Sequence, residues 1–568
     1  MALLVATLLA LGGVGDPAAW AAGSTGTTGT GTTGTGTTGV VGSAGSDWVP
    51  SFTSAMAWTP GQAVDTTVRQ VVPLGVGGKL VRVQLANTFG TGPLAVGAAT
   101  VGVQAVGAAA IPGSFHALTF GGAAGVEVPV GGTVWSDPLP LSTSAGESLL
   151  VSVWVSGPAI VSAHYDAGPM SYATADYGGD QTLAASGSGF GLPSTWDRWV
   201  STVDVAGGGP TSATVAFGDS ISDGFNKHCG FSDVCQLTTP WPTWLQKRVT
   251  QLPAAQQTAV VDESITANTL TTINTPKADQ FRSGGGGPPG LTRMAADLLD
   301  QPGVRRVILL LGTNDLWFGA TADQLIAGYR TFVARAEARG IEVIGSTLLP
   351  RAGSEGWTAT DEQQRNVVNH WILTSHTFPV VLDLAAVVAN VYNGACQPDQ
   401  MFPPFNSGDS LHPNTAGQLA MANAIPTTLV GAPSTAELAP LTKAVPTSGC
   451  PHPVVVRDTY AAGASGTADP ATTVPSTTTP STTTPSTTAP TGTTPTGTSA
   501  PSTTPRGTSA TAASSTGAGS GPGGVGSLAW AVVVILVLAV AAAFEARRRQ
   551  LRRRRRLLAR RRAARRSF

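Results

Sequence analysis

Strand-like and helical segments alternate regularly after Gly207, and this alternation limits the possible folds more than any other feature of the sequence. Apolar runs typical of buried strands occur at 214–217, 258–261, 305–311, 341–347 and 378–382. Helical segments lie between them, near 242–252, 291–299, 322–339 and 362–374. Five such units predict a parallel sheet covered by helices on both faces. Ligands bind such sheets beyond the carboxyl ends of the strands, so we expect the site there.

Residues 47–207 show a different pattern, in which short alternating apolar segments are separated by Gly, Pro and Asn turns. The clearest segments are 79–86, 100–106, 125–130 and 148–155. Because helical periodicity is almost absent, this region predicts an all-β sandwich or jelly-roll domain, which precedes an α/β domain at 208–432. Its tryptophans would bind carbohydrate if they are exposed, or else pack in the core or at an interface; they are Trp48, Trp58 and Trp135.

The N-terminal segment has the composition of a targeting sequence followed by a linker. The apolar run 2–14 and the A-x-A-like sequence Ala19-Trp20-Ala21 predict a signal peptide over 1–21, although the usual basic start is missing. Gly and Thr repeats dominate 22–46 and cannot bury a core, so we expect a flexible linker. Together these segments predict an exported protein.

The C-terminal part combines a polar stalk, an apolar run and a basic tail. Thr, Ser and Pro dominate 463–526, which predicts an extended stalk. The uncharged run 527–544 is long enough to cross a thin bilayer and is predicted to be a transmembrane helix rather than a buried core helix. Arginines crowd 545–568, and the positive-inside rule places this tail in the cytoplasm and the preceding domains outside the cell.

The zero net charge of the chain conceals an uneven distribution. Thirteen of the 33 Lys and Arg residues lie between Arg547 and Arg566, which leaves 20 basic against 32 acidic residues in 1–544. An acidic body argues against nucleic acid as a partner, because phosphate binding needs a cationic face. The arginine block itself could bind nucleic acid. Because it follows a predicted spanning helix, we expect it instead to set the orientation of that helix and to contact anionic lipid.

The four cysteines are Cys229, Cys235, Cys396 and Cys450. The first two share one loop, and the other two flank the end of the α/β domain. An even number of cysteines in an exported protein predicts two disulfides, whereas a metal site would need tighter C-x-x-C pairs or histidine partners. We therefore expect a disulfide-tied extension at 433–462 and no bound metal.

Two short motifs follow predicted strands. The GDS motif at 218–220 places Ser220 near a helix N-terminus, where backbone N–H groups can stabilise a developing anion. The alternative is that this serine caps the helix. The GTND motif at 312–315 lies at the same level of the sheet, and Asn314 would either donate its amide to an oxyanion or occupy a turn.

A third motif, DSLHPN, occupies 409–414. The D-x-x-H spacing allows the Asp409 carboxylate to contact the His412 imidazole and fix its tautomer, so that the other ring nitrogen can accept a serine proton. A surface turn is the alternative. Asp219 and Asp315 have no surrounding ligand cluster and are interpreted as structural, so we expect no cofactor.

In this order within one α/β domain, GDS, GTND and DSLHPN resemble the motif blocks of the SGNH/GDSL hydrolase family over about 214–425. The segments TVRQ (67–70), VRVQLANTFG (81–90) and ALTFGG (117–122) are similar to actinobacterial secreted SGNH hydrolases that carry an N-terminal β-sandwich. The resemblance implies a flavodoxin-like α/β hydrolase domain behind an all-β sandwich or jelly roll.

The resemblance also implies a role for each site residue. Ser220 would be the nucleophile, His412 the base and Asp409 the orienting acid. The backbone N–H of Ser220, the side chain of Asn314 and a backbone N–H of the second motif block would hold the oxyanion. In that block Ala267 stands where the family usually has glycine. If the backbone could not adopt the required φ and ψ, losing this donor would lower the rate about 10²- to 10³-fold.

These features predict a monomeric, membrane-anchored serine esterase with extracellular catalytic domains, acting on carbohydrate acetyl esters or lipid esters. Trp317 and Phe318 could line an apolar part of the site or simply pack. The alternative is a cell-surface adhesin or wall-binding protein whose hydrolase domain has decayed. The triad motifs are complete, and the only hint of decay is Ala267.

Overall fold

The computed structural model describes residues 47–165, 171–209, 212–225, 239–253, 257–391 and 396–430. All of them belong to one compact unit. The predicted signal peptide, linker, disulfide-tied extension, stalk, spanning helix and basic tail lie outside the described residues, so these assignments stay predictions. None of the helices within the described residues combines the length and the hydrophobicity that a membrane span requires.

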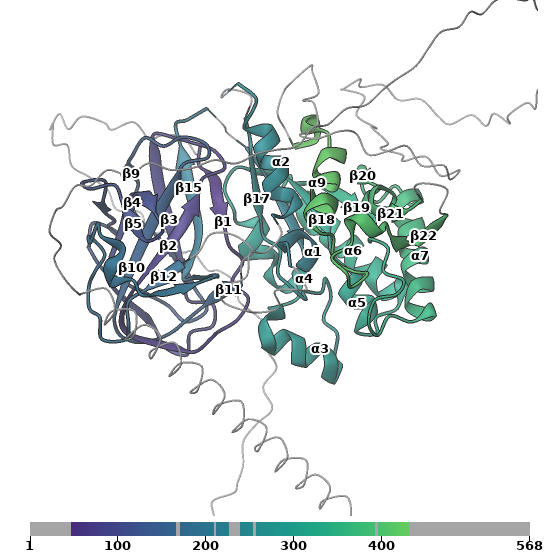
Figure 1. Ribbon diagram of the computed structural model, residues 1–568, viewed down its shortest axis with the longest axis horizontal. Coiled ribbons are helices and arrows are strands. Elements are labelled where there is room, and N and C mark those ends of the chain that lie inside the picture. The colour runs from purple at the N-terminus through teal and green to yellow at the C-terminus, as the bar shows by residue number, and fades with distance from the viewer. Residues whose placement is uncertain are drawn as a thin grey trace, which may run out of the picture. The chain divides into compact units, whose positions relative to one another are not determined.

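The N-terminal part is all-β and consists mainly of two antiparallel sheets (Figure 1). One sheet has the order β1-β15-β3-β8, with β9 also paired to β3: β1 (Val49–Thr53), β15 (Val200–Ala206), β3 (Leu80–Ala86), β8 (Thr133–Trp135) and β9 (Leu139–Pro140). The other has the order β13-β12-β2-β10-β4-β5, with β6 and β7 paired to β4: β13 (Leu192–Ser194), β12 (Ser171–Ala173), β2 (Gln62–Pro73), β10 (Ser148–Ile160), β4 (Leu94–Val106), β5 (Ala109–Ala110), β6 (His116–Ala117) and β7 (Val126–Val128). A further pair joins β11 (Ala163–Tyr165) to β14 (Trp196–Arg198).

Alternating side chains of the two sheets meet in one core. Val83 and Leu85 of β3 are buried, and they share a hydrophobic cluster with Val151 and Val153 of β10 and Val203 of β15. Since successive residues of a strand point to opposite faces, this spacing accounts for the period of two in the sequence. The predicted all-β domain is confirmed.

The three tryptophans of this domain contact other side chains. The Arg82 guanidinium contacts the rings of Trp48 and Trp135, at 4.6 and 4.1 Å from their centroids. Trp58 meets the ring of Trp196 edge to face, with centroids 5.1 Å apart. Cation–π and edge-to-face contacts of this kind explain why these rings are partly buried. All three rings make packing contacts and also stay partly exposed, so both interpretations of these tryptophans stay predictions.

The second part is an α/β domain with a five-stranded parallel sheet (Figure 1). Its order is β17-β16-β18-β19-β20, which corresponds to the flavodoxin-like order 2-1-3-4-5 along the chain. The strands are β16 (Ala213–Gly218), β17 (Ala259–Asp262), β18 (Val304–Leu310), β19 (Glu342–Ser346) and β20 (Val380–Leu382); β21 (Ala389–Asn390) and β22 (Gln397–Met401) form a separate pair. The predicted parallel sheet and its five strands are confirmed.

The described α-helices are α1 (Ser220–Asp223), α2 (Trp241–Val249), α3 (Pro276–Phe281), α4 (Gly290–Met294), α5 (Thr313–Trp317), α6 (Ala322–Glu337), α7 (Ala359–Thr374), α8 (Leu384–Val388) and α9 (Thr415–Ala424). The helix expected at 291–299 is α4 followed by a wider π-helical segment, Ala295–Leu299. Capping boxes begin the two longest helices: Thr321 and Gln324 bond each other's backbone N–H at the start of α6, and Thr358 and Asp361 do so at α7.

Both faces of the parallel sheet are buried. Val215 and Phe217 of β16 belong to one hydrophobic cluster, whereas Ala216 between them belongs to another on the opposite face. Ile308 of β18 joins the cluster of Ala216, and Leu309 joins that of Val215. Burial on both faces explains why these strands read as continuous apolar runs instead of alternating ones.

The β-sandwich contacts the α/β domain through β1 and the loops beside it. The Thr53 hydroxyl donates to the carbonyl oxygen of Asp262, at the end of β17, at 2.9 Å. The Gln246 amide of α2 donates to the carbonyl oxygen of Gly75 at 2.8 Å. The sandwich therefore touches the point where the chain leaves β17 and runs toward Ala267.

Candidate active site

Ser220 is the first residue of α1 and lies directly beyond the carboxyl end of β16. The residue that caps this helix is Asp219, whose Oδ1 accepts the backbone N–H of Ile221 at 3.0 Å. The alternative in which Ser220 itself caps the helix is therefore wrong, and its hydroxyl is available to a different partner. That partner is His412, whose Nε2 lies 2.9 Å from the serine Oγ.

His412 and Asp409 lie in a turn after β22. Nδ1 of His412 lies 2.7 Å from Oδ2 of Asp409, and Oδ1 of the same carboxylate accepts the backbone N–H groups of Leu411 and His412 at 3.0 and 2.9 Å. Asn406 holds the turn, since its Oδ1 accepts the backbone N–H of Asp409 at 3.2 Å. The predicted contact between carboxylate and imidazole is present, in a turn and not on a helix.

The charge of Asp409 fixes the proton arrangement of the histidine. Partial burial alone would raise the pKa of Asp409, but hydrogen bonds and charge attraction from His412, together with the two backbone N–H groups, hold this pKa far below its usual value. The anionic carboxylate can only accept, so Nδ1 of His412 carries the proton. In a neutral imidazole Nε2 then has a lone pair directed at the Ser220 hydroxyl, which acts as the donor.

The three predicted oxyanion groups follow the carboxyl ends of β16, β17 and β18: Ser220 begins α1, Ala267 lies in a loop, and Asn314 lies in α5. Ala267 has a φ of 65°, so this alanine adopts the left-handed conformation that usually favours glycine, at a cost of about 1 kcal/mol. Within the described residues, the backbone N–H groups of Ser220 and Ala267 have no hydrogen-bond acceptor. The Asn314 amide donates to the carbonyl oxygen of Asn268 at 3.0 Å, which joins the GTND loop to the loop of Ala267.

The sequence of residues 216–420, which contains Ser220, Asn314, Asp409 and His412, matches the GDSL-like lipase/acylhydrolase family. This part of the chain is a GDSL-like acylhydrolase domain. It is an SGNH-type ester hydrolase domain, and an all-β domain precedes it. No curated protein matches the chain.

Several solved structures are similar to the hydrolase domain. Axe2, an acetylxylan esterase from Geobacillus stearothermophilus, is 19% identical, with 38% of this chain and 93% of that chain covered and a TM-score of 0.27. A lipolytic protein of the G-D-S-L family from Desulfitobacterium hafniense DCB-2 is 20% identical, with 37% and 95% covered and a TM-score of 0.26. Because these TM-scores are low, the assignment depends on the family match and on the geometry of the site.

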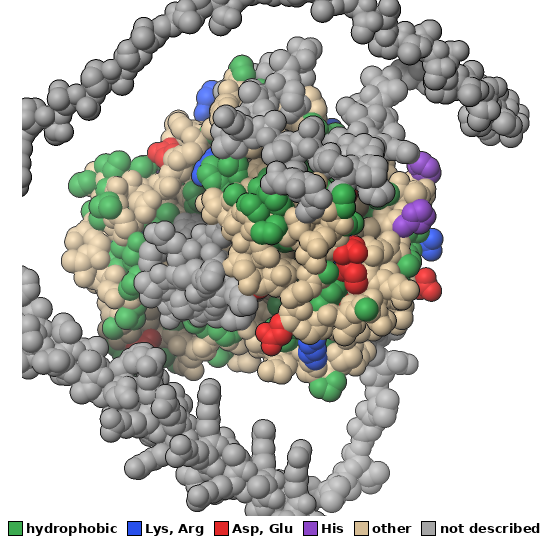
Figure 2. Space-filling view, turned by 45° about the vertical axis from the view of Figure 1, so that its right-hand side comes forward, with side chains coloured by type: hydrophobic (Ala, Val, Ile, Leu, Met, Phe, Trp, Pro, Cys, Tyr) green, Lys and Arg blue, Asp and Glu red, His purple; other side chains and the backbone are tan. Residues whose placement is uncertain are grey.

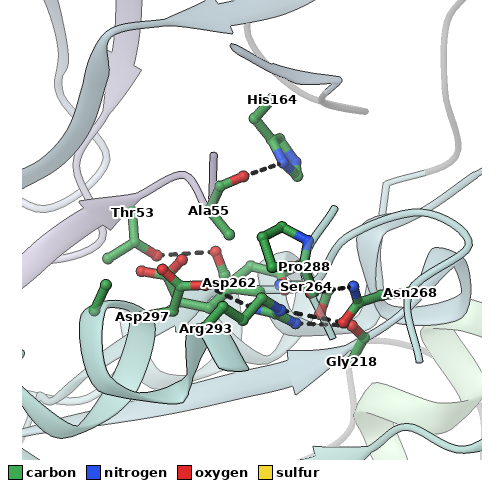
Figure 3. A network of polar contacts seen from close by, with 12 residues as sticks. Thr53, Ala55, His164, Gly218, Asp262, Ser264, Asn268, Pro288, Arg293 and Asp297 are labelled. Carbon is green, nitrogen blue, oxygen red and sulfur yellow. Dashed lines mark hydrogen bonds and ion pairs between the residues drawn. The ribbon is translucent and has the colours of Figure 1, made fainter. Parts of the chain in front are cut away.

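Arg293 is a buried residue of the hydrolase domain that the sequence motifs do not mark. Its guanidinium donates to the carbonyl oxygens of Glu263 and Gly218 and to Oδ1 of Asn268, at 2.6, 3.3 and 3.1 Å (Figure 3). A salt bridge of 2.9 Å to Asp297 balances its charge. Arg293 therefore ties the end of β16 to the loop of Ala267. The only sequence signal is an Arg-Asp pair four residues apart inside an apolar helical segment.

The two aspartates interpreted as structural both stabilise loops of the site. Asp315 accepts the backbone N–H groups of Leu270 and Thr271, each at 2.8 Å. Burial raises the pKa of Asp315 to about 6, although its hydrogen bonds from Leu270 and Thr271 act to lower it. Burial likewise raises the pKa of Asp219 to about 7, although its bond from the Ile221 N–H acts to lower it. Among the described residues, no group of His, Cys, Asp or Glu has the arrangement of a metal site.

The aromatic residues after the GTND motif pack together. The ring centroids of Trp317 and Phe318 lie 5.3 and 5.4 Å from that of Phe281 in α3, and Nζ of Lys277 lies 3.4 Å from the Trp317 ring centroid. Phe318 is buried, so it supports the packing interpretation. The aromatic ring beside the predicted base is instead that of Phe225, 4.9 Å from the His412 ring.

Cys396 is disulfide-bonded. Cys229, Cys235 and Cys450 lie outside the described residues, so the pairing of the four cysteines stays a prediction.

Proposed function

We propose that the hydrolase domain cleaves carboxylic esters through an acyl-enzyme formed on Ser220. The observation that carries this proposal is the continuous chain of contacts from Ser220 Oγ through the His412 ring to Asp409, at 2.9 and 2.7 Å. Asp219 takes over the helix cap and leaves the serine hydroxyl to the histidine. A nucleophile, a base and an orienting acid in this order are the parts of a serine hydrolase triad.

In the proposed reaction, Ser220 Oγ attacks the ester carbonyl carbon while Nε2 of His412 takes the hydroxyl proton. The tetrahedral intermediate collapses when the imidazolium gives this proton to the departing alcohol oxygen, which leaves an acyl-serine. Water then attacks the acyl carbon, and the same imidazole takes the proton and returns it to Ser220. Asp409 remains anionic and stabilises the imidazolium in both halves of the reaction.

The oxyanion would bind to the backbone N–H groups of Ser220 and Ala267 and to the Asn314 side chain. Asn314 has two amide hydrogens, and one of them is used by the carbonyl oxygen of Asn268. The second hydrogen is then available to the substrate, in an orientation that the first bond fixes. Donors held in place before the reaction stabilise the developing charge without reorganisation.

We propose neutral esters as substrates, either carbohydrate acetyl esters or lipid esters. Residues 1–544 are acidic overall, which disfavours anionic substrates. The face in Figure 2 carries few and scattered charged side chains among hydrophobic and neutral ones on its described surface. The half-buried ring of Phe225 offers an apolar contact beside His412.

We also propose that the enzyme is exported and held at the cell membrane by 527–544. The support is the sequence: an apolar start, a Thr/Ser/Pro stalk, an uncharged run and an arginine tail. Protease added to intact cells should remove the hydrolase domain and leave a small fragment that contains the arginine tail in the membrane fraction. Full protection of the hydrolase domain in intact cells would contradict this location.

The activity is tested with the full-length protein in detergent, using p-nitrophenyl esters of increasing chain length. We expect turnover that disappears in Ser220→Ala and persists in Ser188→Ala, a control at an exposed serine of the β-sandwich. The preferred chain length separates acetyl esters from lipid esters. Equal background rates for the wild type and Ser220→Ala would contradict the proposal and favour the adhesin interpretation.

A further inference from the structure

A histidine of the β-sandwich reaches into the hydrolase domain next to the nucleophile helix. His164 lies on β11, and its Nε2 lies 3.4 Å from Oδ1 of Asp223, the last residue of α1. On the other side of the ring, Nδ1 lies 2.7 Å from the carbonyl oxygen of Ala55 (Figure 3). His164 and Asp223 are both 5% exposed, so water contributes little to solvating this pair.

The second oxygen of Asp223 holds the loop that carries the predicted oxyanion donor. Oδ2 accepts the backbone N–H of Thr266 at 2.8 Å and also the hydroxyl of the same residue. Thr266 directly precedes Ala267, whose φ of 65° is unfavourable for alanine. Two hydrogen bonds to the preceding residue are an efficient means of keeping Ala267 in this conformation.

The chemistry of the pair favours a cationic histidine. The Ala55 carbonyl can only accept, so Nδ1 carries a proton, and Nε2 needs a second proton to attract the carboxylate. The Asp297 carboxylate, salt-bridged to Arg293, also interacts electrostatically with this ring. Removing one partner of a buried ion pair leaves the other charge uncompensated, so loss of the histidine should disturb Asp223 and the bonds that it makes to Thr266.

The sandwich supports the opposite side of the same loop through packing. Asn268, next to Ala267, donates its side-chain amide to the carbonyl oxygens of Gly286 and Pro288 at 2.7 and 2.8 Å. Between them, Gly287 lies so close to Ala57 of the sandwich that an added Cβ would be 3.3 Å from the Ala57 backbone. Both ends of the Thr266–Asn268 segment therefore depend on contacts that lead back to the sandwich.

We propose that His164 is a positioning residue that holds the Ala267 backbone N–H in place for the oxyanion, acting through Asp223 and Thr266. The inference rests on the proposed ester hydrolysis and extends it, because it gives the β-sandwich a role in the reaction. The histidine touches no reacting atom, so its effect should appear in the chemical step and not in substrate binding.

The test compares His164→Leu and His164→Gln with His116→Leu, a control at an exposed histidine of the same domain. In the full-length protein we expect kcat of His164→Leu to fall about 10- to 100-fold with KM changed less than about threefold. His164→Gln, whose amide can donate to Asp223, should recover part of this loss. If the histidine only stabilises the fold, His164→Leu should have a lower melting temperature but the same kcat as the wild type in its folded form. His164→Leu and His164→Gln would then also have equal kcat values.

Amide hydrogen exchange over 262–270 supplies a readout that does not need activity. We expect faster exchange at this loop in His164→Leu and unchanged exchange in His116→Leu. If the wild type hydrolyses no ester, the proposed function fails and the exchange measurement alone decides whether the histidine orders the loop. Unchanged exchange overturns the inference, and so does a kcat of His164→Leu equal to that of His116→Leu in an active enzyme.

Discussion

Asp219 caps the helix that Ser220 begins, by accepting the backbone N–H of Ile221 at 3.0 Å. This bond has two consequences. The serine hydroxyl is left for His412, and a carboxyl group is placed in a fully buried position, where its charge is costly. Asp219 therefore couples the geometry of the nucleophile to the pH dependence of stability.

The stability of the wild type should fall as the pH rises because Asp219 ionises, and Asp219→Asn should abolish this part of the pH dependence. Burial raises the pKa of Asp219 to about 7 from 3.8 in the unfolded chain. Between these values the folded protein binds the extra proton, so the free energy of unfolding falls with increasing pH and the loss is complete above about pH 7. Asparagine keeps the capping oxygen without ionising, and the stability of the variant relative to wild type should rise by roughly 1–3 kcal/mol between pH 5 and 8.

Urea unfolding of both proteins at pH 5 and pH 8 measures this difference. Other carboxyls with raised pKa values, such as Asp315 and Asp204, are present in both proteins and contribute equally. A stability difference that is the same at both pH values would contradict an ionisable, buried Asp219.

Asp409→Asn should lower kcat by about 10³- to 10⁴-fold with little change in KM. The neutral amide cannot stabilise the imidazolium, and it can donate to Nδ1 and move the ring proton to Nε2, where it blocks acceptance of the serine proton. Steady-state kinetics with a p-nitrophenyl ester checks this, beside Asp300→Asn as a control at a surface ion pair with Arg339. Comparable rates in the two variants would remove Asp409 from the triad.

Asn314→Ala should lower kcat by about 10²- to 10³-fold, because one oxyanion donor is lost. The fold should persist, since a single hydrogen bond to the Asn268 carbonyl contributes about 1 kcal/mol. Asn314→Asp, which keeps the shape but places a negative charge beside the oxyanion, should be at least as slow. Single-turnover rates of acyl-enzyme formation give the measurement, and a change of less than about threefold in both variants would speak against an oxyanion role.

Ala267→Gly should be less destabilising than the same change in an ordinary helix. Glycine relieves the strain of a φ of 65°, which offsets the entropy that glycine adds to the unfolded chain. We expect a change in stability within about 0.5 kcal/mol, whereas Ala334→Gly, at an exposed position of α6, should cost about 0.5–1 kcal/mol. Urea midpoints compare the two, and equal losses would mean that Ala267 is not strained.

The elements of the α/β domain follow closely from local sequence. Continuous apolar runs mark β16 and β18 because both sheet faces are buried, so every side chain of these strands must be apolar or small. In the β-sandwich, alternation marked β3 and β10, while β2 and β15 were not identified because buried polar residues such as Arg69 and Asp204 interrupt their pattern. A buried ion pair or hydrogen-bond network produces no periodic signal.

The order of an all-β domain followed by an α/β domain could be predicted from the sequence, because the periods of strands and helices are local properties. The candidate triad of Ser220, Asp409 and His412 was predicted from the resemblance of the three motifs to one family, since each motif alone left another interpretation open. Three features could be read only from the packed chain: Asp219 caps α1, Ala267 adopts a positive φ, and Arg293 and His164 both support the loop of Ala267. His164 and Asp223 belong to different domains, and their contact exists only because both domains bury the same surface. A buried polar group needs a hydrogen-bond or ion-pair partner. Whether a residue is buried depends on how the whole chain packs and not on the residues next to it in the sequence.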